Sequence, residues 1–355
     1  MSLYNPYYQD AINLLQQLIA IPSFSKEEGA TADCIADFLH SKKIETERIG
    51  HNIIARNKYF SKEKKSLLLN SHHDTVKPNN NYTHDPFSPT IEDGKLFGLG
   101  SNDAGGALVS LLATFLYFYE DADLPYNLIF IASAEEEISG KNGIELALTL
   151  TENIEVAIVG EPTQMQMAVA ERGLMVVDGE AKGIAGHAAR KEGENALYKA
   201  INDIQWIQSH RFDKVSDLLG ETTMSVTVIE TDNKQHNVVP ASCKFVIDVR
   251  CNELYTFEEI IDLLKKNLKS EVAPRSMRLR STSISLDHPL IQAGISLGRN
   301  YYGSPTTSDK ALMPFPALKM GPGDSARSHT ADEFIYLEEI REGIELYVEM
   351  IKKLS

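Results

Sequence analysis

The sequence predicts an α/β protein in which a domain with a largely parallel sheet is interrupted by an inserted ferredoxin-like (βαββαβ) domain. Short apolar runs alternate with helical patterns over residues 1–172, which is typical of a parallel sheet with covering helices. The order of predicted elements changes over residues 173–285, and the first pattern resumes over residues 286–355. The chain of 355 residues is also longer than one ordinary domain.

Two helices and a strand are expected before residue 66. Apolar residues at helical spacing predict a helix over Asn13–Ala20. Ser25, followed by Glu28, is typical of a capping box, so a second helix is expected to open there and to run to about Lys43. A strand is expected near Asn52–Asn57.

Three later runs of the first domain are expected to be strands, and each leads to ionisable residues. The runs are Leu67–Leu69, Asn127–Ser133 and Glu155–Val159, and Ala107–Tyr119 is expected to be a buried helix. Ligands of open α/β sheets gather at the carboxyl ends of the strands. We therefore expect the residues that follow these strands to lie together: His72, Glu136, Glu137 and Glu161.

The segment Leu67–Val76 contains the motif around which the other candidates are arranged. In an extended chain, His72 and Asp74 point to one side and His73 to the other. A metal-binding imidazole usually donates its second N–H group to a carboxylate, so Asp74 suits His72 as a partner. Asp103 adds a second carboxylate at the start of the next apolar helix.

A different order of elements, strand–helix–strand–strand–helix–strand, is expected between residues 173 and 285. The expected ranges are Leu174–Gly183, Glu194–His210, Thr222–Glu230, Ser242–Arg250, Thr256–Lys269 and Met277–Ser285. This order is that of the ferredoxin-like split motif. The first domain then resumes with helices over Pro289–Gly298 and Leu337–Leu354.

Composition and charge argue against several functional classes. The net charge of −15 disfavours binding to nucleic acid, whose phosphates attract cationic surfaces. The longest nearly apolar run, Ala107–Tyr119, is too short to span a bilayer, and Met1–Asp10 lacks the apolar core of a signal peptide. The three cysteines, Cys34, Cys243 and Cys251, form no CxxC pair, which favours a reducing, cytoplasmic location.

The candidate residues carry the donor atoms of a dinuclear metal site: His72, Asp103, Glu137, Glu161 and His329. Two imidazoles and three carboxylates suit two ions of the Zn²⁺ type if one carboxylate bridges them. Paired ions about 3.5–4 Å apart can activate a water molecule and polarise a carbonyl group. Hydrolysis also needs a base, and because neighbouring side chains diverge, Glu136 can serve as the base while Glu137 binds metal.

Five motifs in a fixed order carry a resemblance to a known family. They are SHHDTV, SNDAGG, AEEE, VGEPT and RSHTADE, with the ferredoxin-like insert before the last of them. Together they resemble the M20 family of di-zinc aminoacylases and peptidases, and within it most closely the branch of acetylornithine deacetylases and succinyl-diaminopimelate desuccinylases. The resemblance covers nearly the whole chain.

The resemblance implies a catalytic domain that binds two Zn²⁺ ions, which Co²⁺ can replace. It divides the ligands into two sets that share Asp103 as a bridge: His72, Asp103 and Glu161 for one ion, and Asp103, Glu137 and His329 for the other. It also implies that Asp74 orients His72 and that Glu136 is the general base.

For the insert, the resemblance implies a lid that also joins two subunits in a homodimer. His187 would reach the active site of the partner subunit and stabilise the oxyanion there, together with Asn237. Arg172 and Arg250 would bind the substrate carboxylate, a task that suits a guanidinium group, and a structural ion pair is the alternative for Arg250. Thr307 lies where the family has a substrate-contacting threonine.

Three residues depart from the family pattern without removing a ligand or the base. His73 stands where a small residue is usual, Lys77 where proline is common, and Glu135 where aspartate is usual. His73 leaves open an exchange of roles with His72.

The resemblance implies removal of an N-acyl group from a small-molecule substrate, with N-acetyl-ornithine, in arginine biosynthesis, as the first candidate. N-succinyl-ornithine and N-succinyl-diaminopimelate are alternatives, as are peptides cleaved by a di- or tripeptidase and a carrier protein from which lysine or ornithine is released. A zinc-dependent binding module without turnover is the non-enzymatic alternative. Neither nucleic acid nor a membrane is an expected partner.

Overall fold

The protein is described by a computed structural model over residues 5–354. The chain folds into two compact units. Of the described residues, the first unit contains 5–169, 283–302 and 308–354, and the second contains 170–282 and 303–307. The expected boundaries at 172/173 and 285/286 each lie three residues after the corresponding boundary of the structure.

The segment 303–307 corrects the expected division, which assigned it to the first domain. The Arg172 N–H donates to the Ser304 carbonyl at 3.2 Å, and the Thr307 hydroxyl donates to the Arg172 carbonyl at 3.2 Å. Arg172 was expected in the first domain, but it belongs to the second unit. These hydrogen bonds join segments far apart in the sequence, which no local pattern indicates.

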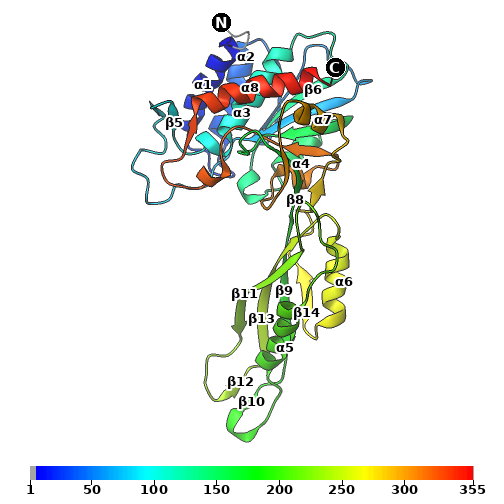
Figure 1. The fold of residues 1–355 in the computed structure, drawn as a ribbon. Helices are drawn as coiled ribbons and strands as arrows, with labels where there is room; N and C mark the ends of the chain where they lie inside the picture. Colours follow the sequence, from blue (N-terminus) through cyan, green and yellow to red (C-terminus); the bar gives the residue numbers. More distant parts are fainter. Residues whose placement is uncertain (1–4, 355) are drawn as a thin grey trace. The chain divides into compact units, whose positions relative to one another are not determined.

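The first unit contains most of a mixed sheet with a parallel centre, so the expected α/β fold class is confirmed (Figure 1). The strand order is β1-β2-β6-β3-β7-β17-β8-β15, and β16 pairs with β8. The strands are β1 (Thr46–Ile49), β2 (Asn52–Arg56), β3 (Ser66–His72), β6 (Asn127–Ser133), β7 (Ile154–Val159), β8 (Met167–Glu171), β15 (Thr282–Ser283), β16 (Tyr301–Ser304) and β17 (Ala317–Lys319). Because β3 is parallel to both β6 and β7, their carboxyl ends lie at one edge.

Helices cover both faces of this sheet (Figure 1). The helices are α1 (Asn5–Ile19), α2 (Gly29–Ser41), α3 (Gly106–Phe118), α4 (Ile144–Leu148), α7 (Pro289–Ser296) and α8 (Leu337–Lys352). On one face, α3 packs on β3 and β6 and contacts α1 and α8, whereas α4 packs on the other face against Leu68 and Ile129. Burial on both sides explains the continuous apolar runs of the strands. Within residues 5–354, no helix is long and apolar enough to cross a membrane.

A smaller sheet brings the C-terminal motif beside the loop that precedes α3. It has the order β18-β5-β4 and consists of β4 (Thr90–Glu92), β5 (Lys95–Phe97) and β18 (Phe334–Tyr336). Phe334 pairs with Phe97, and the Gly98 N–H donates to the Glu333 carbonyl at 3.0 Å. The RSHTADE motif therefore lies next to the residues that lead to Asp103.

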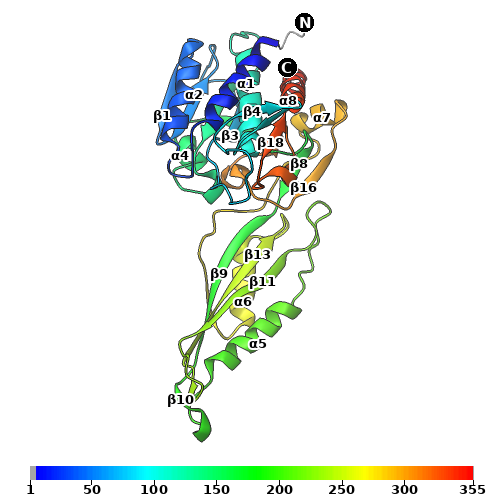
Figure 2. The ribbon, with the colours of Figure 1, turned by 90° about the vertical axis from the view of Figure 1, so that its left-hand side faces the viewer.

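The second unit has the βαββαβ order expected for the insert (Figure 2). Its elements are β9 (Gly173–Lys182), α5 (Ala196–Ser209), β11 (Thr223–Thr231), β13 (Ser242–Cys251), α6 (Phe257–Asn267) and β14 (Glu271–Pro274). The antiparallel sheet has the order β11-β13-β9-β14. Alternate residues of β9 and β13, such as the paired Val177 and Ile247, form one apolar face on which α5 and α6 pack.

The last strand of the insert does not lie at Met277–Ser285, as expected. The last strand of the insert is β14, which pairs with β9. Within the expected range, only Thr282–Ser283 forms a strand, β15. β14 is an edge strand of four residues, too short for an apolar alternation to be recognised. Its Pro274 is tolerated because the strand lies at the edge of the sheet.

The second helix does not open with a capping box at Ser25. α2 begins after Glu28, whose carboxylate accepts the N–H groups of Lys26 at 2.7 Å and Glu135 at 3.1 Å. The Ser25 hydroxyl instead donates to Asp74 Oδ2 at 2.7 Å. Both side chains of the expected cap therefore make long-range contacts around the edge of the sheet.

Candidate metal centre

His72 ends strand β3, and its imidazole is 1% exposed. Its Nδ1 lies 3.0 Å from the Asp74 backbone carbonyl and 3.4 Å from the Asp74 carboxylate, so Nδ1 donates to Asp74 and Nε2 faces the other carboxylates of the cluster. Burial disfavours the charged imidazolium, but the carboxylates of Glu136, Asp103 and Asp74 raise the pKa of His72 well above its usual value. The surroundings of His72 therefore favour positive charge.

His73 points to the other side of the strand. Its Nδ1 lies 2.9 Å from the Thr31 hydroxyl and its Nε2 lies 3.0 Å from the His51 carbonyl. Burial lowers the pKa of His73 to about 4, so the ring is neutral. Because both ring nitrogens are hydrogen-bonded away from the cluster, His73 has no nitrogen that could bind a metal there.

The AEEE turn is held by carboxylates from two other segments. The Asp74 carboxylate accepts the N–H groups of Glu136 at 3.0 Å and Glu137 at 3.2 Å. The Glu28 carboxylate accepts the N–H group of Glu135, which has a φ of 55°. The turn after β6 is thereby fixed to the end of β3, and the Glu136 and Glu137 side chains are directed to the same edge.

Asp103 lies between the two candidate histidines. Its Oδ1 is 3.3 Å from His72 Nε2, and its Oδ2 is 3.5 Å from His329 Nε2. The residue belongs to the turn Ser101–Gly105, which leads into α3. Each carboxylate oxygen thus faces a different imidazole, which is the arrangement of a bridging ligand.

Glu137 and His329 face each other on one side of Asp103. His329 Nε2 lies 3.1 Å from one Glu137 carboxylate oxygen and 3.3 Å from the other. The hydrogen bond with Glu137 raises the pKa of His329 to about 9, although partial burial opposes this. The His329 side chain is 54% exposed, so this side of the cluster is open to solvent.

Glu161 and Glu136 lie on the His72 side. Glu161 Oε1 and Glu136 Oε2 are each 3.9 Å from His72 Nε2. Gly160, between β7 and Glu161, allows the close approach of α3, since a Cβ atom there would lie 2.7 Å from Leu111 Cδ1. Both glutamates therefore face the same nitrogen of His72.

The electrostatics of the cluster favour a bound cation. Burial raises the pKa of Glu136 well above its usual value, and the negative charges of Glu161, Asp309 and Glu137 act in the same direction. Donor atoms within 4.8 Å of one another form two groups: His72 with Asp103 and Glu137, and His72 with Glu136 and Glu161. Nitrogen and oxygen donors of this kind fit divalent ions such as Zn²⁺.

Two buried carboxylates beside the cluster were not predicted from the sequence. Asp309 accepts a hydrogen bond from the Ser133 hydroxyl at 2.6 Å, and burial raises its pKa to about 7. Glu333 accepts N–H groups from the loop that contains Asp103, and burial, followed by the charge of Asp103, raises its pKa to about 8. The one signal in the sequence was that Glu333 is the last residue of the RSHTADE motif, whereas Asp309 lies in none of the five motifs.

The remaining candidates belong to the second unit: Arg172, His187, Asn237, Arg250 and Thr307. His187 lies in strand β10 (Gly186–His187), which pairs with β12 (Val238–Val239), and the Ala188 N–H donates to the Asn237 carbonyl at 3.0 Å. The ribbon thus brings His187 and Asn237 together. Arg172 donates to the Leu219 carbonyl, and Arg250 forms an ion pair with Asp248 through Nε at 2.8 Å and Nη2 at 3.1 Å.

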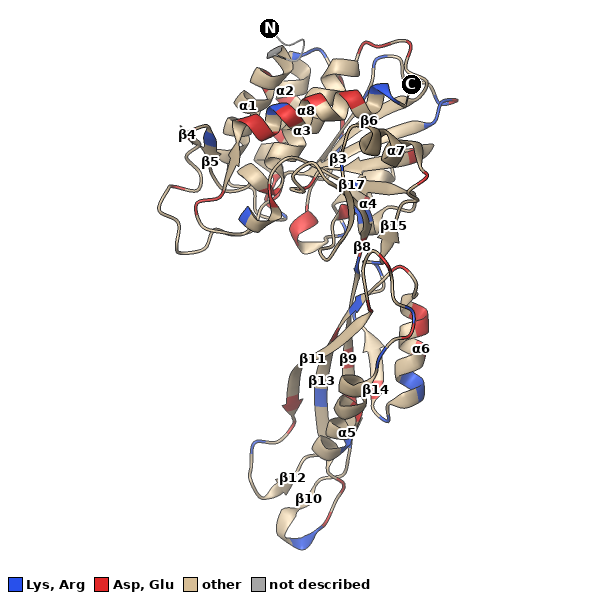
Figure 3. Cartoon of the chain, viewed as in Figure 1, with Lys and Arg blue, Asp and Glu red and all other residues tan. Residues whose placement is uncertain are grey.

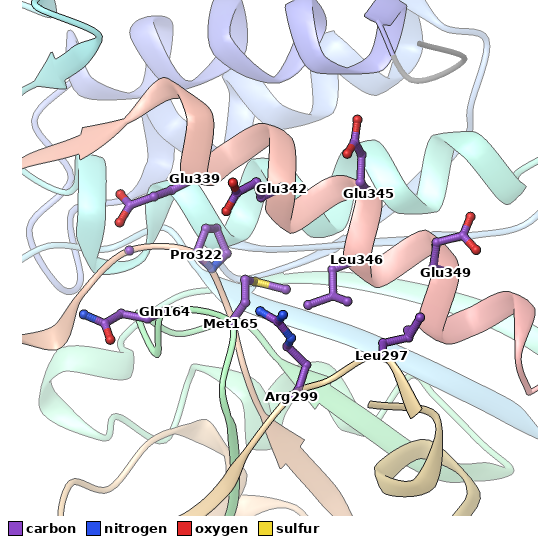
Figure 4. Close-up of a pocket in the computed structure, with 11 residues that line it drawn as sticks. Gln164, Met165, Leu297, Arg299, Pro322, Glu339, Glu342, Glu345, Leu346 and Glu349 are labelled. Carbon is purple, nitrogen blue, oxygen red and sulfur yellow. The ribbon is translucent and has the colours of Figure 1, made fainter. Parts of the chain in front are cut away.

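A separate cavity lies along α8 in the first unit. Acidic residues recur on this helix (Figure 3), and Glu342 and Glu345 are among the residues that line the cavity. Arg299 points towards the helix from the opposite side (Figure 4). Its volume is about 560 Å³. No candidate metal ligand lines this cavity.

The imidazoles and carboxylates at this sheet edge form the type of donor set with which metal-dependent hydrolases hold their ions. Residues 68–353 match the profile of peptidase family M20/M25/M40, and the chain belongs to this family. The family assignment that the five motifs indicated is therefore confirmed.

Curated relatives are similar to this chain over most of its length. The succinyl-diaminopimelate desuccinylase of Cereibacter sphaeroides (strain ATCC 17025) is 27% identical over 340 residues, which cover 90% of this chain and 88% of the relative. The succinyl-diaminopimelate desuccinylase of Rickettsia bellii is 24% identical in an alignment of 368 positions that covers 94% of each chain.

Solved structures share the fold. Aminopeptidase PepT from Bacillus cereus has a TM-score of 0.76 at 19% identity over 98% of both chains. The YXEP protein of Bacillus subtilis, described as a dinuclear metal-binding peptidase of the M20 family, has a TM-score of 0.72 at 16% identity over 98% of both chains.

Proposed function

We propose that this chain is a dinuclear zinc amidohydrolase that removes an N-acyl group from an amino acid. One observation carries the proposal: the two oxygens of Asp103 face His72 on one side and His329 on the other. Glu161 lies beside His72, and Glu137 lies beside His329. Each imidazole and its neighbouring glutamate would hold one ion, with Asp103 shared between them.

When bound, two such ions lower the pKa of an attacking water to about 7 and polarise the amide carbonyl. Glu136 takes a proton from that water while the oxygen of the water forms a bond to the acyl carbon. Glu136 then gives the proton to the amide nitrogen as the C–N bond breaks, which releases the acid and the free amine. Asp74 supports both parts of the site, because it contacts His72 and accepts the Glu136 N–H.

For the second unit, we propose the roles that the family resemblance implies. His187, in the β10–β12 ribbon, and Asn237, which directly precedes β12, would stabilise the oxyanion in the active site of the partner subunit. Arg172 and Thr307 would contact the substrate. The two-bond ion pair of Arg250 with Asp248 supports the structural alternative for Arg250.

A homodimer through the second unit is part of the proposal. β11 is an edge strand, and its Val228 and Ile229 are 45% and 47% exposed. Tyr198 on α5 is also exposed. Apolar residues on an edge strand whose outer side is unpaired favour pairing with another chain. We also propose a cytoplasmic location, which the three free cysteines support.

The curated relatives favour an N-succinyl amino acid as the substrate, with N-succinyl-diaminopimelate and N-succinyl-ornithine ahead of N-acetyl-ornithine. The test measures kcat/KM for these three compounds, a tripeptide and a dipeptide on one zinc-loaded preparation. We expect the highest kcat/KM for a succinylated amino acid. Faster cleavage of the peptides would contradict the proposal in favour of a peptidase, and no turnover of any compound would favour a binding module.

A further inference from the structure

We infer that Glu333 is a positioning residue that fixes the bridging carboxylate of Asp103 relative to His329. The inference rests on the proposed dinuclear site and adds to it a residue outside both ligand sets. Glu333 is 2% exposed, and it belongs to the C-terminal segment that also contains His329.

The Glu333 carboxylate binds three backbone N–H groups of the loop that contains Asp103. Its Oε1 accepts from Asn102 at 2.8 Å and from Asp103 at 2.9 Å, and its Oε2 accepts from Gly100 at 3.2 Å. These three bonds account for N–H groups that the irregular turn before α3 leaves without helical partners. The orientation of the Asp103 backbone therefore depends on a residue more than two hundred positions later in the chain.

The backbone of Glu333 is attached to the same loop. Its carbonyl accepts the Gly98 N–H at 3.0 Å, and the next residue, Phe334, pairs with Phe97 in the small sheet. Glu333 is thus joined to the loop through both its side chain and its main chain. This connection joins the segment that contains His329 to the loop that contains Asp103, and Asp103 Oδ2 lies 3.5 Å from His329 Nε2.

The preceding residue, Asp332, offers a matched control. Its carboxylate also accepts from two backbone N–H groups, Thr83 at 2.7 Å and His84 at 2.9 Å, and from the Thr83 hydroxyl at 2.7 Å. That loop contains no candidate metal ligand. A purely structural role for such carboxylates would make Glu333 and Asp332 equivalent with respect to metal binding.

Amide substitutions separate the two carboxylates. In Glu333→Gln, one oxygen can still accept from Asn102 and Asp103, but the new NH₂ group faces the Gly100 N–H, so a donor meets a donor. In Asp332→Asn, the new NH₂ group faces the Thr83 hydroxyl, which can rotate and accept. Glu333→Ala removes all three bonds.

The experiment removes the metal from each protein with a chelator and titrates it with Co²⁺, and it follows the heat of binding and the visible absorption spectrum. Loss of a partner outside the ligand shell typically costs about 10–100-fold in metal affinity. We expect Glu333→Ala to bind Co²⁺ about 10–100-fold more weakly and Glu333→Gln about 10-fold more weakly, each with an altered spectrum. Asp332→Asn is expected to match the unsubstituted protein.

Unchanged Co²⁺ affinity and spectrum in a folded Glu333→Gln protein would overturn the inference, as would equal weakening in Asp332→Asn. Glu333→Gln carries the test if Glu333→Ala does not fold. Failure of the unsubstituted protein to bind two ions would instead contradict the proposed function, so the two failures are distinguishable.

Discussion

Glu136→Gln is expected to lower kcat by about 10²–10⁴-fold, the range that a general base contributes. The amide cannot accept the proton of the attacking water, whereas it keeps the shape of the side chain. Because Glu136 is outside both proposed ligand sets, the variant is expected to retain both metal ions. Steady-state kinetics and the metal content of the purified variant measure the two effects on one sample.

Glu135→Gln is the matched control for this variant. The Glu135 carboxylate accepts hydrogen bonds from the Asn142 side chain at 2.9 Å and the Asn142 N–H at 3.3 Å, and it therefore stabilises the turn. We expect a lower Tm with little change in kcat. Turnover by Glu136→Gln at the rate of the unsubstituted enzyme would refute the role of Glu136, and its loss of metal would show that Glu136 is a ligand.

Asp103→Ala is expected to abolish binding of both ions, because its two oxygens face both imidazoles. His329→Ala is expected to remove only one ion, since His329 lies beside Glu137 and Asp103, whereas Glu161 lies beside His72. Both variants would lose nearly all activity, but they would differ in the number of zinc ions bound per protein. The ratio of bound zinc to protein after dialysis distinguishes them.

His210→Ala provides the control for loss of an imidazole. His210 stacks on Trp206 in the second unit and contacts no candidate ligand. Its replacement is expected to leave the zinc ratio unchanged. A zinc ratio for Asp103→Ala equal to that of His329→Ala would mean that Asp103 does not bridge.

Residue alternation and motif order predicted much of the site from the sequence. The spacing of two between His72 and Asp74 placed both side chains on one side of β3, with His73 on the other. Parallel strands with ionisable residues after their carboxyl ends predicted that the glutamates of separate motifs meet at one edge. Alternation also accounts for the Arg250–Asp248 pair, since both residues lie on one face of β13.

The features that the sequence did not predict depend on contacts between distant segments. Asp309 and Glu333 resemble surface carboxylates in a local pattern, and only the packing of other segments buries them. Ser25 was expected to cap a helix, but its hydroxyl binds Asp74 instead. The four-residue strand β14 owes its place to pairing with β9 and not to its own apolar residues.

The central claim is that Asp103 bridges two metal ions at the edge of the sheet. Anomalous diffraction at the zinc absorption edge, from crystals of the zinc-loaded enzyme, tests this claim most directly. The account predicts two peaks about 3.5–4 Å apart, with one Asp103 oxygen within bonding distance of each. A single peak, or two peaks of which only one contacts Asp103, would contradict it.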